Sequence, residues 1–182
     1  MQPHPTCPDD RESPRQRSYA CRYGWQIQSR IIAQRNFDRI LRHGWIDRLI
    51  DAICGRSSAL LCLADMQSPP PPDSEEILGI QMVPLARICG SEGRVHDFDR
   101  HFAPLHEHIR ERWVSLAALR SEGHPLPPVD LVQVGADYYI LDGHHRVSIA
   151  HAFNDDTIEA RVTRWPAPIP ALAAQREPAL AH

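Results

Sequence analysis

Five consecutive residues, DGHHR at 142–146, combine the chemical features of an anion-binding site. The apolar residues before Asp142 predict a strand, Gly143 predicts a tight turn, and the pattern from His144 onward predicts a helix. The first turn of a helix has unpaired backbone N–H groups and carries the positive end of the helix dipole. A glycine before it lets the backbone approach a ligand closely. The sequence therefore predicts that a phosphate group binds at this turn.

Three side chains that can carry positive charge follow this glycine directly. His144, His145 and Arg146 would lie at the positive end of the helix dipole, which is unfavourable unless an anion is bound there. A guanidinium can bind phosphate through two parallel hydrogen bonds, and a histidine can donate a hydrogen bond or transfer a proton. We expect all five residues of 142–146 to bind the ligand, with His144 and His145 as catalytic candidates. The alternative is an ordinary turn followed by a solvated helix start.

A second polar segment, GSEGR at 90–94, has the composition of a loop. Arg94 is suited to holding a second phosphate, and Ser91 and Gly93 are expected to contact the ligand beside it. Glu92 is the candidate general base toward a hydroxyl nucleophile, or a ligand for Mg²⁺. The alternative is a solvated polar loop, with an aspartate further along the chain capping the next helix.

Hydrophobic periodicity predicts the elements that position these two segments. Apolar residues at helical spacing predict a helical stretch from Trp25 that is interrupted at Gly44 and ends near Gly55, and the short apolar run 59–64 is interpreted as a short helix. Further helices are predicted over 105–121 and from His144, and strands over 80–88, 129–134, 138–141 and 157–164, with the two middle strands forming a hairpin. The expected fold class is α+β, a small mixed sheet with packed helices and an N-terminal helical extension.

Proline marks the expected boundaries, because a run of prolines favours an extended chain without backbone hydrogen bonds. The sequence has four consecutive prolines at 69–72. We expect a disordered tail over 1–22, a helical extension over 23–66, a linker over 67–76, the α+β domain over 77–165 and a disordered tail over 166–182.

The composition excludes several classes of protein. The 182 residues include no lysine, which excludes a lysine Schiff base and a Walker-type phosphate lysine, and the net charge of −3 disfavours a strongly basic nucleic-acid binder. The five cysteines form no CxxC pair, and adjacent histidines on a helix point about 100° apart, so we expect no metal site. No leader-like N-terminus and no membrane-spanning run of about 18 apolar residues is present, so we expect a cytoplasmic protein without a membrane partner.

Several segments in a fixed order carry a resemblance to a known family. LPPV at 126–129, YILDGHHR at 139–146, Ala150 and Ile158, preceded by VPLARI at 83–88, resemble the ParB N-terminal domain and sulfiredoxin superfamily. The resemblance covers about half of the chain, residues 80–164. It implies a ParB/sulfiredoxin-like fold that holds nucleotide phosphates at the strand–glycine–helix turn. The implied cofactor is ATP or ADP, or CTP as in ParB-type proteins, together with Mg²⁺.

The departures from the family's motifs narrow the expected function. ParB-type proteins have GERR at this turn and continue into a helix-turn-helix domain, so DNA is a disfavoured partner here. Sulfiredoxin has a reactive cysteine where this chain has His144, which disfavours sulfinic-acid reduction. The free-serine kinases of the superfamily have DGHTR, which differs only at His145. We expect phosphotransfer from ATP or ADP to a small hydroxyl substrate; the alternative is a non-catalytic regulatory or DNA-associated module.

Overall fold

The computed structural model describes residues 14–55, 57–66, 70–71, 74–93 and 95–166, and of residues 14–23 it describes the backbone alone. The helices and strands are, in chain order, α1 (Pro14–Ile53), β1 (Leu61–Cys62), α2 (Leu63–Met66), β2 (Glu76–Pro84), β3 (Ile88–Ser91), α3 (Arg110–Ser121), β4 (Val129–Val134), β5 (Asp137–Asp142), α4 (His144–Ala152) and β6 (Thr157–Trp165). Short 3₁₀ helices lie at Leu85–Arg87 and Glu107–Ile109.

The strands form one mixed sheet in the order β1-β3-β5-β4-β6-β2. β4 and β5 are an antiparallel hairpin, and β2 pairs antiparallel with β6. The pairs β1–β3, β3–β5 and β4–β6 are parallel. The predicted α+β class, the mixed sheet and the hairpin are therefore confirmed. β5 lies inside the sheet between β3 and β4, and it pairs with β3 as far as Ile140 and with β4 as far as Asp142.

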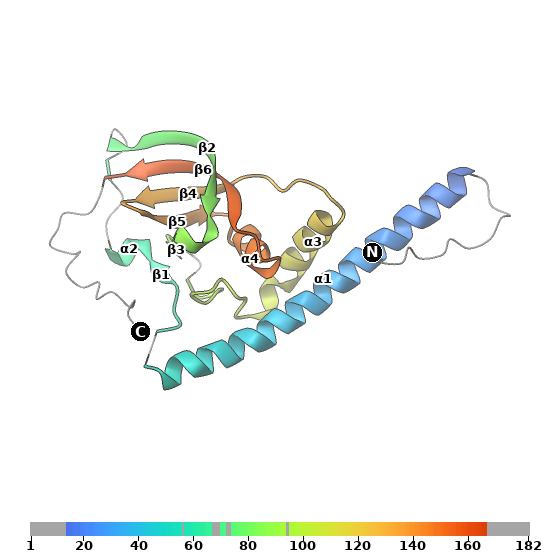
Figure 1. Ribbon diagram of the computed structural model, residues 1–182, viewed down its shortest axis with the longest axis horizontal. Helices are drawn as coiled ribbons and strands as arrows, with labels where there is room; N and C mark the ends of the chain where they lie inside the picture. The colour runs from blue at the N-terminus through green and yellow to red at the C-terminus, as the bar shows by residue number, and fades with distance from the viewer. Residues whose placement is uncertain (1–13, 56, 67–69, 72–73, 94, 167–182) are drawn as a thin grey trace.

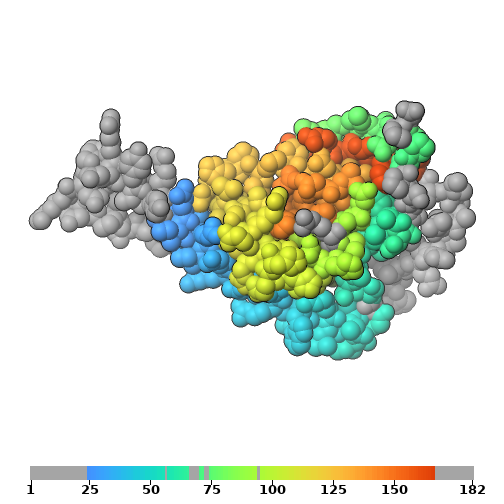
Figure 2. Space-filling view, turned by 180° about the vertical axis from the view of Figure 1, so that it is seen from behind, coloured from blue at the N-terminus to red at the C-terminus, as the bar shows by residue number. Residues whose placement is uncertain are grey.

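The three longer helices, α1, α3 and α4, lie in successive layers on one side of the sheet (Figure 1), while the short α2 places Leu63 against Val132 and Tyr139 on the other side. α4 contacts the sheet through β4 and β6, α3 packs on α4, and α1 packs on α3. Seen from behind, α1 runs along the molecule next to the segment 95–121 (Figure 2). In the part of the chain that the structure describes, no helix is long and apolar enough to cross a membrane.

α4 lies between two hydrophobic clusters and joins them. On the sheet side, Val147 and Ala150 belong to a cluster that includes Val129 and Ile140. On the opposite side, Ile149 belongs to a cluster built from α1, α3 and the loop before α3, with members Ala33, Phe37, Phe98, Ile109, Trp113, Val114, Ala117 and Ala118. This double burial fixes the position of α4, and with it the turn from which α4 begins.

The N-terminal helix differs from its prediction because Gly44 does not interrupt it. α1 continues through Gly44, which is buried where the helix crosses the loop before α3. A Cβ atom at this position would lie 3.1 Å from Cβ of Ala103 and 3.5 Å from Oδ2 of Asp99. Gly44 therefore allows a close contact between α1 and the loop before α3. A glycine at this position, which suggested a helix break from the sequence, is instead explained by this contact.

Two short segments also differ from the predictions made for them. The expected strand over 80–88 is the end of β2 and the beginning of β3, separated by the 3₁₀ turn that follows Pro84. A proline has no N–H for a continuing ladder, and the next residue, Leu85, donates its N–H to the carbonyl of Asp156 instead. The expected helix over 59–64 is β1 followed by α2, because Leu61 and Cys62 pair with β3 at the edge of the sheet.

The expected domain boundaries stay predictions. α1 begins at Pro14, inside the expected tail 1–22, and proline is well suited to the first position of a helix. Phe37 of the expected extension shares a cluster with Trp113. Residues 1–13, 67–69, 72–73 and 167–182, which include most of the expected tails and half of the linker, lie outside the described residues.

The packing of α1 is tested by a matched pair of substitutions. Gly44→Leu places a side chain against Ala103 and should destabilise the fold by about 1–3 kcal/mol because the contact has no room for it. Gly24→Leu, on the same helix with nothing within 4 Å of its Cβ position, should be neutral or stabilise by up to about 1 kcal/mol through helix propensity. Urea denaturation followed by circular dichroism measures both. Equal effects of the two substitutions would show that α1 does not pack on the loop before α3.

Candidate functional site

Gly143 connects β5 directly to α4 in a left-handed conformation with φ 103°. Its Cα is packed against β4: a Cβ atom would lie 2.6 Å from Cγ1 and 2.9 Å from Cβ of Val129. The first helical hydrogen bond runs from the N–H of Val147 to the carbonyl of Gly143, at 3.0 Å. Both backbone conformation and packing therefore require glycine at this position.

The start of α4 carries the positive end of the helix dipole. No side chain caps Gly143, and the first turn of α4 contains no acidic residue. Asp142, just before the helix, is exposed at the end of β5 and pairs with Asp130 of β4. Of the anion site predicted from the sequence, the strand, the glycine turn and the uncapped nine-residue helix are present.

A buried serine from the second predicted segment meets the first residue of the helix. Oγ of Ser91 lies 2.5 Å from Nε2 of His144, and the two residues are 0% and 4% exposed. The hydroxyl also contacts the carbonyls of Ile140 and Gly93, and accepts the N–H of Gly93 at 3.0 Å. Because a hydroxyl has one proton and two carbonyls compete for it, we infer that Nε2 of His144 donates to Ser91. In this arrangement His144 is not positioned to activate Ser91 as a nucleophile.

Phe98 holds the rings of both histidines in place. The ring of His144 stacks on Phe98 with centroids 6.1 Å apart and planes at 16°, while His145 meets it edge-on at 5.6 Å and 88°. Phe98 is fully buried, and His145 is 7% exposed. The alternative of a solvated helix start is therefore wrong for these two side chains. Sequence reasoning missed Phe98, and the only signal for it was one aromatic residue inside a polar segment.

The guanidinium of Arg146 is held by acceptors of the protein itself. Nη1 donates to the carbonyls of Pro127 and Pro128 at 2.7 Å and 2.5 Å, and Nη2 pairs with Oδ2 of Asp142 at 2.6 Å. The side chain is 13% exposed. The sequence predicts that this charge is unfavourable without a bound anion, but two proline carbonyls and the carboxylate of Asp142, which the sequence does not reveal as partners, accept its hydrogen bonds. Whether Arg146 also contacts a phosphate stays a prediction.

Of the other residues in the segment 90–94 that the structure describes, only Gly93 is seen in a hydrogen bond with Ser91 at the turn. Gly93 reaches it through both of its backbone contacts with Ser91. Glu92 is exposed, and its backbone N–H donates to the carbonyl of Ile140 at 3.0 Å. Arg94 lies outside the described residues. Among the residues that the structure describes, no group of three or more His, Cys, Asp or Glu side chains is arranged to hold a metal ion.

Comparison with known proteins adds little to what the geometry of the turn shows. Neither a protein-family model nor a curated protein matches the chain. Among solved structures, sulfiredoxin from Arabidopsis thaliana matches with 23% sequence identity over 48% of this chain and 86% of that chain, at a TM-score of 0.33. Sulfiredoxin is a member of the superfamily that the sequence resembles, but a likeness this weak carries no argument. Membership in that superfamily stays a prediction.

The requirement for glycine at the turn is testable by a matched pair. Gly143→Ala should destabilise the fold by about 2–4 kcal/mol, because it adds backbone strain and a clash with Val129. Gly93→Ala is the control, since no atom lies within 4 Å of its Cβ position, and it should change the free energy of unfolding by less than about 0.5 kcal/mol. Thermal and urea unfolding of both variants measure the difference, and a tolerated alanine at 143 would disprove the left-handed turn.

The structural role of Arg146 predicts a loss of stability that needs no ligand. Arg146→Ala should cost about 2–4 kcal/mol, because it removes charged hydrogen bonds from a mostly buried side chain and leaves two carbonyls unpaired. Arg161→Ala removes an exposed pair with Asp130 and should cost less than about 1 kcal/mol. Ligand-free unfolding curves compare the two. A small effect at Arg146 would mean that its contacts contribute little to stability and that its charge is free for another partner.

Proposed function

We propose that the turn over 142–146 binds the phosphate groups of a nucleotide, ATP or ADP in the first place and CTP as an alternative base. The observation that carries this proposal is the uncapped start of α4 on Gly143, with no acidic residue in the first turn. A nine-residue helix of this kind presents N–H donors and a positive dipole end toward an anion. The contacts of Ser91 and Phe98 support the same proposal, because they hold the start of the helix rigid before a ligand arrives.

The neighbouring residues support phosphotransfer to a small hydroxyl substrate as the reaction. In this reaction the substrate oxygen forms a bond to the terminal phosphorus, and the bond from that phosphorus to the bridging oxygen of the nucleotide breaks. The shortened nucleotide leaves with the electron pair of that bond. We assign the hydroxyl proton to the carboxylate of Glu92, an exposed residue that follows Ser91 in the sequence. Mg²⁺ bound to the polyphosphate would supply charge neutralisation, and the buried His144 and His145 would fix the turn.

A change of charge beside the turn tests the binding step. Gly93→Asp places a carboxylate in open space next to Ser91, so the protein should stay folded while nucleotide affinity falls by about tenfold or more through repulsion. Gly24→Asp introduces the same charge on α1, also in open space, and should leave the affinity unchanged. Calorimetric titration with ATP, ADP and CTP, each with and without Mg²⁺, measures the constants.

A second substitution separates binding from reaction. Glu92→Gln should retain nucleotide affinity and abolish transfer to an alcohol acceptor. Binding without turnover in the unsubstituted protein would instead favour the non-catalytic regulatory alternative. The proposal as a whole fails if no nucleotide binds at millimolar concentration, or if Gly93→Asp and Gly24→Asp change the affinity equally.

A further inference from the structure

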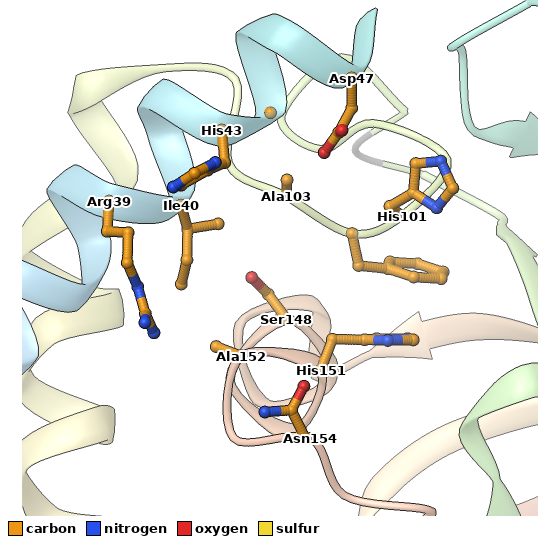
Figure 3. Close-up of a pocket in the computed structure, with 12 residues that line it drawn as sticks. Arg39, Ile40, His43, Asp47, His101, Ala103, Ser148, His151, Ala152 and Asn154 are labelled. Carbon is orange, nitrogen blue, oxygen red and sulfur yellow. The ribbon is translucent and has the colours of Figure 1, made fainter. Parts of the chain in front are cut away.

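A pocket lies between α1 and α4, away from the turn that begins α4 (Figure 3). Its volume is about 420 Å³, within the range of small-molecule sites. α4 contributes Ser148, His151 and Ala152, which follow the start of that helix by one to two turns. α1 and the loop before α3 supply the opposite wall, so the pocket exists only because these three parts pack together.

Ser148 offers this pocket a buried hydrogen-bond donor. Its residue is 2% exposed, and its Oγ accepts the indole N–H of Trp113 at 3.0 Å. Because an indole N–H can only donate, the hydroxyl proton of Ser148 is not used in this bond. Within the described residues no carbonyl accepts that proton. Figure 3 shows the hydroxyl pointing across the gap toward α1, so its proton is available to a molecule in the pocket.

His151 adds a buried polar atom that lacks a partner. Its ring stacks on Phe102 with centroids 5.5 Å apart and planes at 15°. Its Nε2 is buried and makes no hydrogen bond with any described residue. Burial, with a smaller contribution from His101, lowers the pKa of this imidazole, so the ring is neutral at neutral pH. A buried ring nitrogen without a partner costs free energy, and a bound molecule or water would remove that cost.

The backbone around the pocket is held in an unusual conformation. Phe102 and Asn154, with φ of 58° and 56°, are the two non-glycine residues with positive φ in the part of the chain that the structure describes, and both line the pocket. For Asn154 this is the ordinary left-handed position after the end of α4, which asparagine often occupies, but for a bulky residue such as Phe102 it is rare. The carboxylate of Asp99 enforces it in the loop by accepting the N–H groups of His101 and Ala103, each at 2.9 Å. Backbone strain that the surroundings enforce is concentrated at ligand sites in proteins.

One arginine, one carboxylate and several histidines line the pocket. Arg39 and His43 extend from α1, and His101 lies on the loop opposite, while Asp47 is the carboxylate among the lining residues. Among the described residues Arg39 forms no ion pair, unlike Arg48 and Arg110, which contact Asp99 and Asp38. An arginine of this kind on the wall of a pocket suits a carboxylate or a phosphate.

We propose that this pocket binds a small organic anion through a carboxylate or phosphate group, with Arg39 and Ser148 binding the oxygens and the histidines lining the rest of the site. The inference is independent of nucleotide binding at the turn. The two sites share α4 but have different walls, β3 and Phe98 for one and α1 for the other.

The proposal is tested by titrating the full chain with inorganic phosphate and with succinate while recording the NMR signals of the histidine rings. Succinamide, which has the same carbon chain without charge, is the control ligand. We expect the ring signals of His43, His101 and His151 to shift with at least one of the two anions and not with succinamide. Gly93→Asp should leave these shifts unchanged, because it alters only the turn.

A matched pair of arginines on α1 decides whether binding occurs in the pocket. Arg39→Gln should weaken binding of the anion by about tenfold or more, the effect of losing one charged hydrogen-bonded contact. Arg35→Gln, an exposed residue of the same helix that does not line the pocket, should change it less than about twofold. Both arginines are exposed residues, so the fold should persist after either substitution.

Three results would overturn the proposal: no shift of these rings with phosphate or succinate at millimolar concentration, shifts confined to His144 and His145, or equal weakening by the two substitutions.

Discussion

The space between β4 and the start of α4 has no room for a side chain at residue 143, and this constraint determines the form of the candidate site. Val129 fills that space, so the chain leaves β5 through a left-handed glycine and enters a helix at once. No intervening loop is left that could move the helix relative to the strand. The guanidinium of Arg146 strengthens the same corner, because it joins the first turn of α4 to the segment that leads into β4. The start of α4 is thus a rigid continuation of the central strand β5, as an anion site requires.

α4 contributes three of the buried polar residues of the described chain. Most of this short helix is buried, including His144, His145 and Ser148. Apolar residues would be the simpler choice for a helix between two hydrophobic clusters. The polar residues instead contact Ser91, Phe98 and Trp113 with defined geometry. These contacts hold in place the start and the α1 side of α4, the two places where we propose ligand binding.

The sequence predicted the elements whose signals are local, and missed the contacts that join distant segments. The hairpin over 129–142, the glycine turn and the helix after it follow from short-range patterns, and the structure contains all three. Gly44 looks like a helix end in the sequence, but α1 continues through it, and the glycine is explained by the loop that crosses α1 near Ala103. In the same way, the sequence suggested that the charge of Arg146 needs a bound anion. The structure shows that the backbone carbonyls of Pro127 and Pro128 accept its hydrogen bonds, and backbone carbonyls cannot be recognised from the residue types. The contact between Ser91 and His144 joins residues 53 positions apart, and only the parallel pairing of β3 with β5 brings it about.

The central claim is that the start of α4 binds phosphate groups. The most direct measurement is an NMR titration of the backbone amides of the full chain, with ATP compared against adenosine. If the claim is correct, the amide signals of Gly143, His144 and Gly93 shift together with ATP at one common affinity and do not shift with adenosine, which lacks the phosphates. The absence of any shift at these amides with ATP, or equal shifts with adenosine, would contradict it.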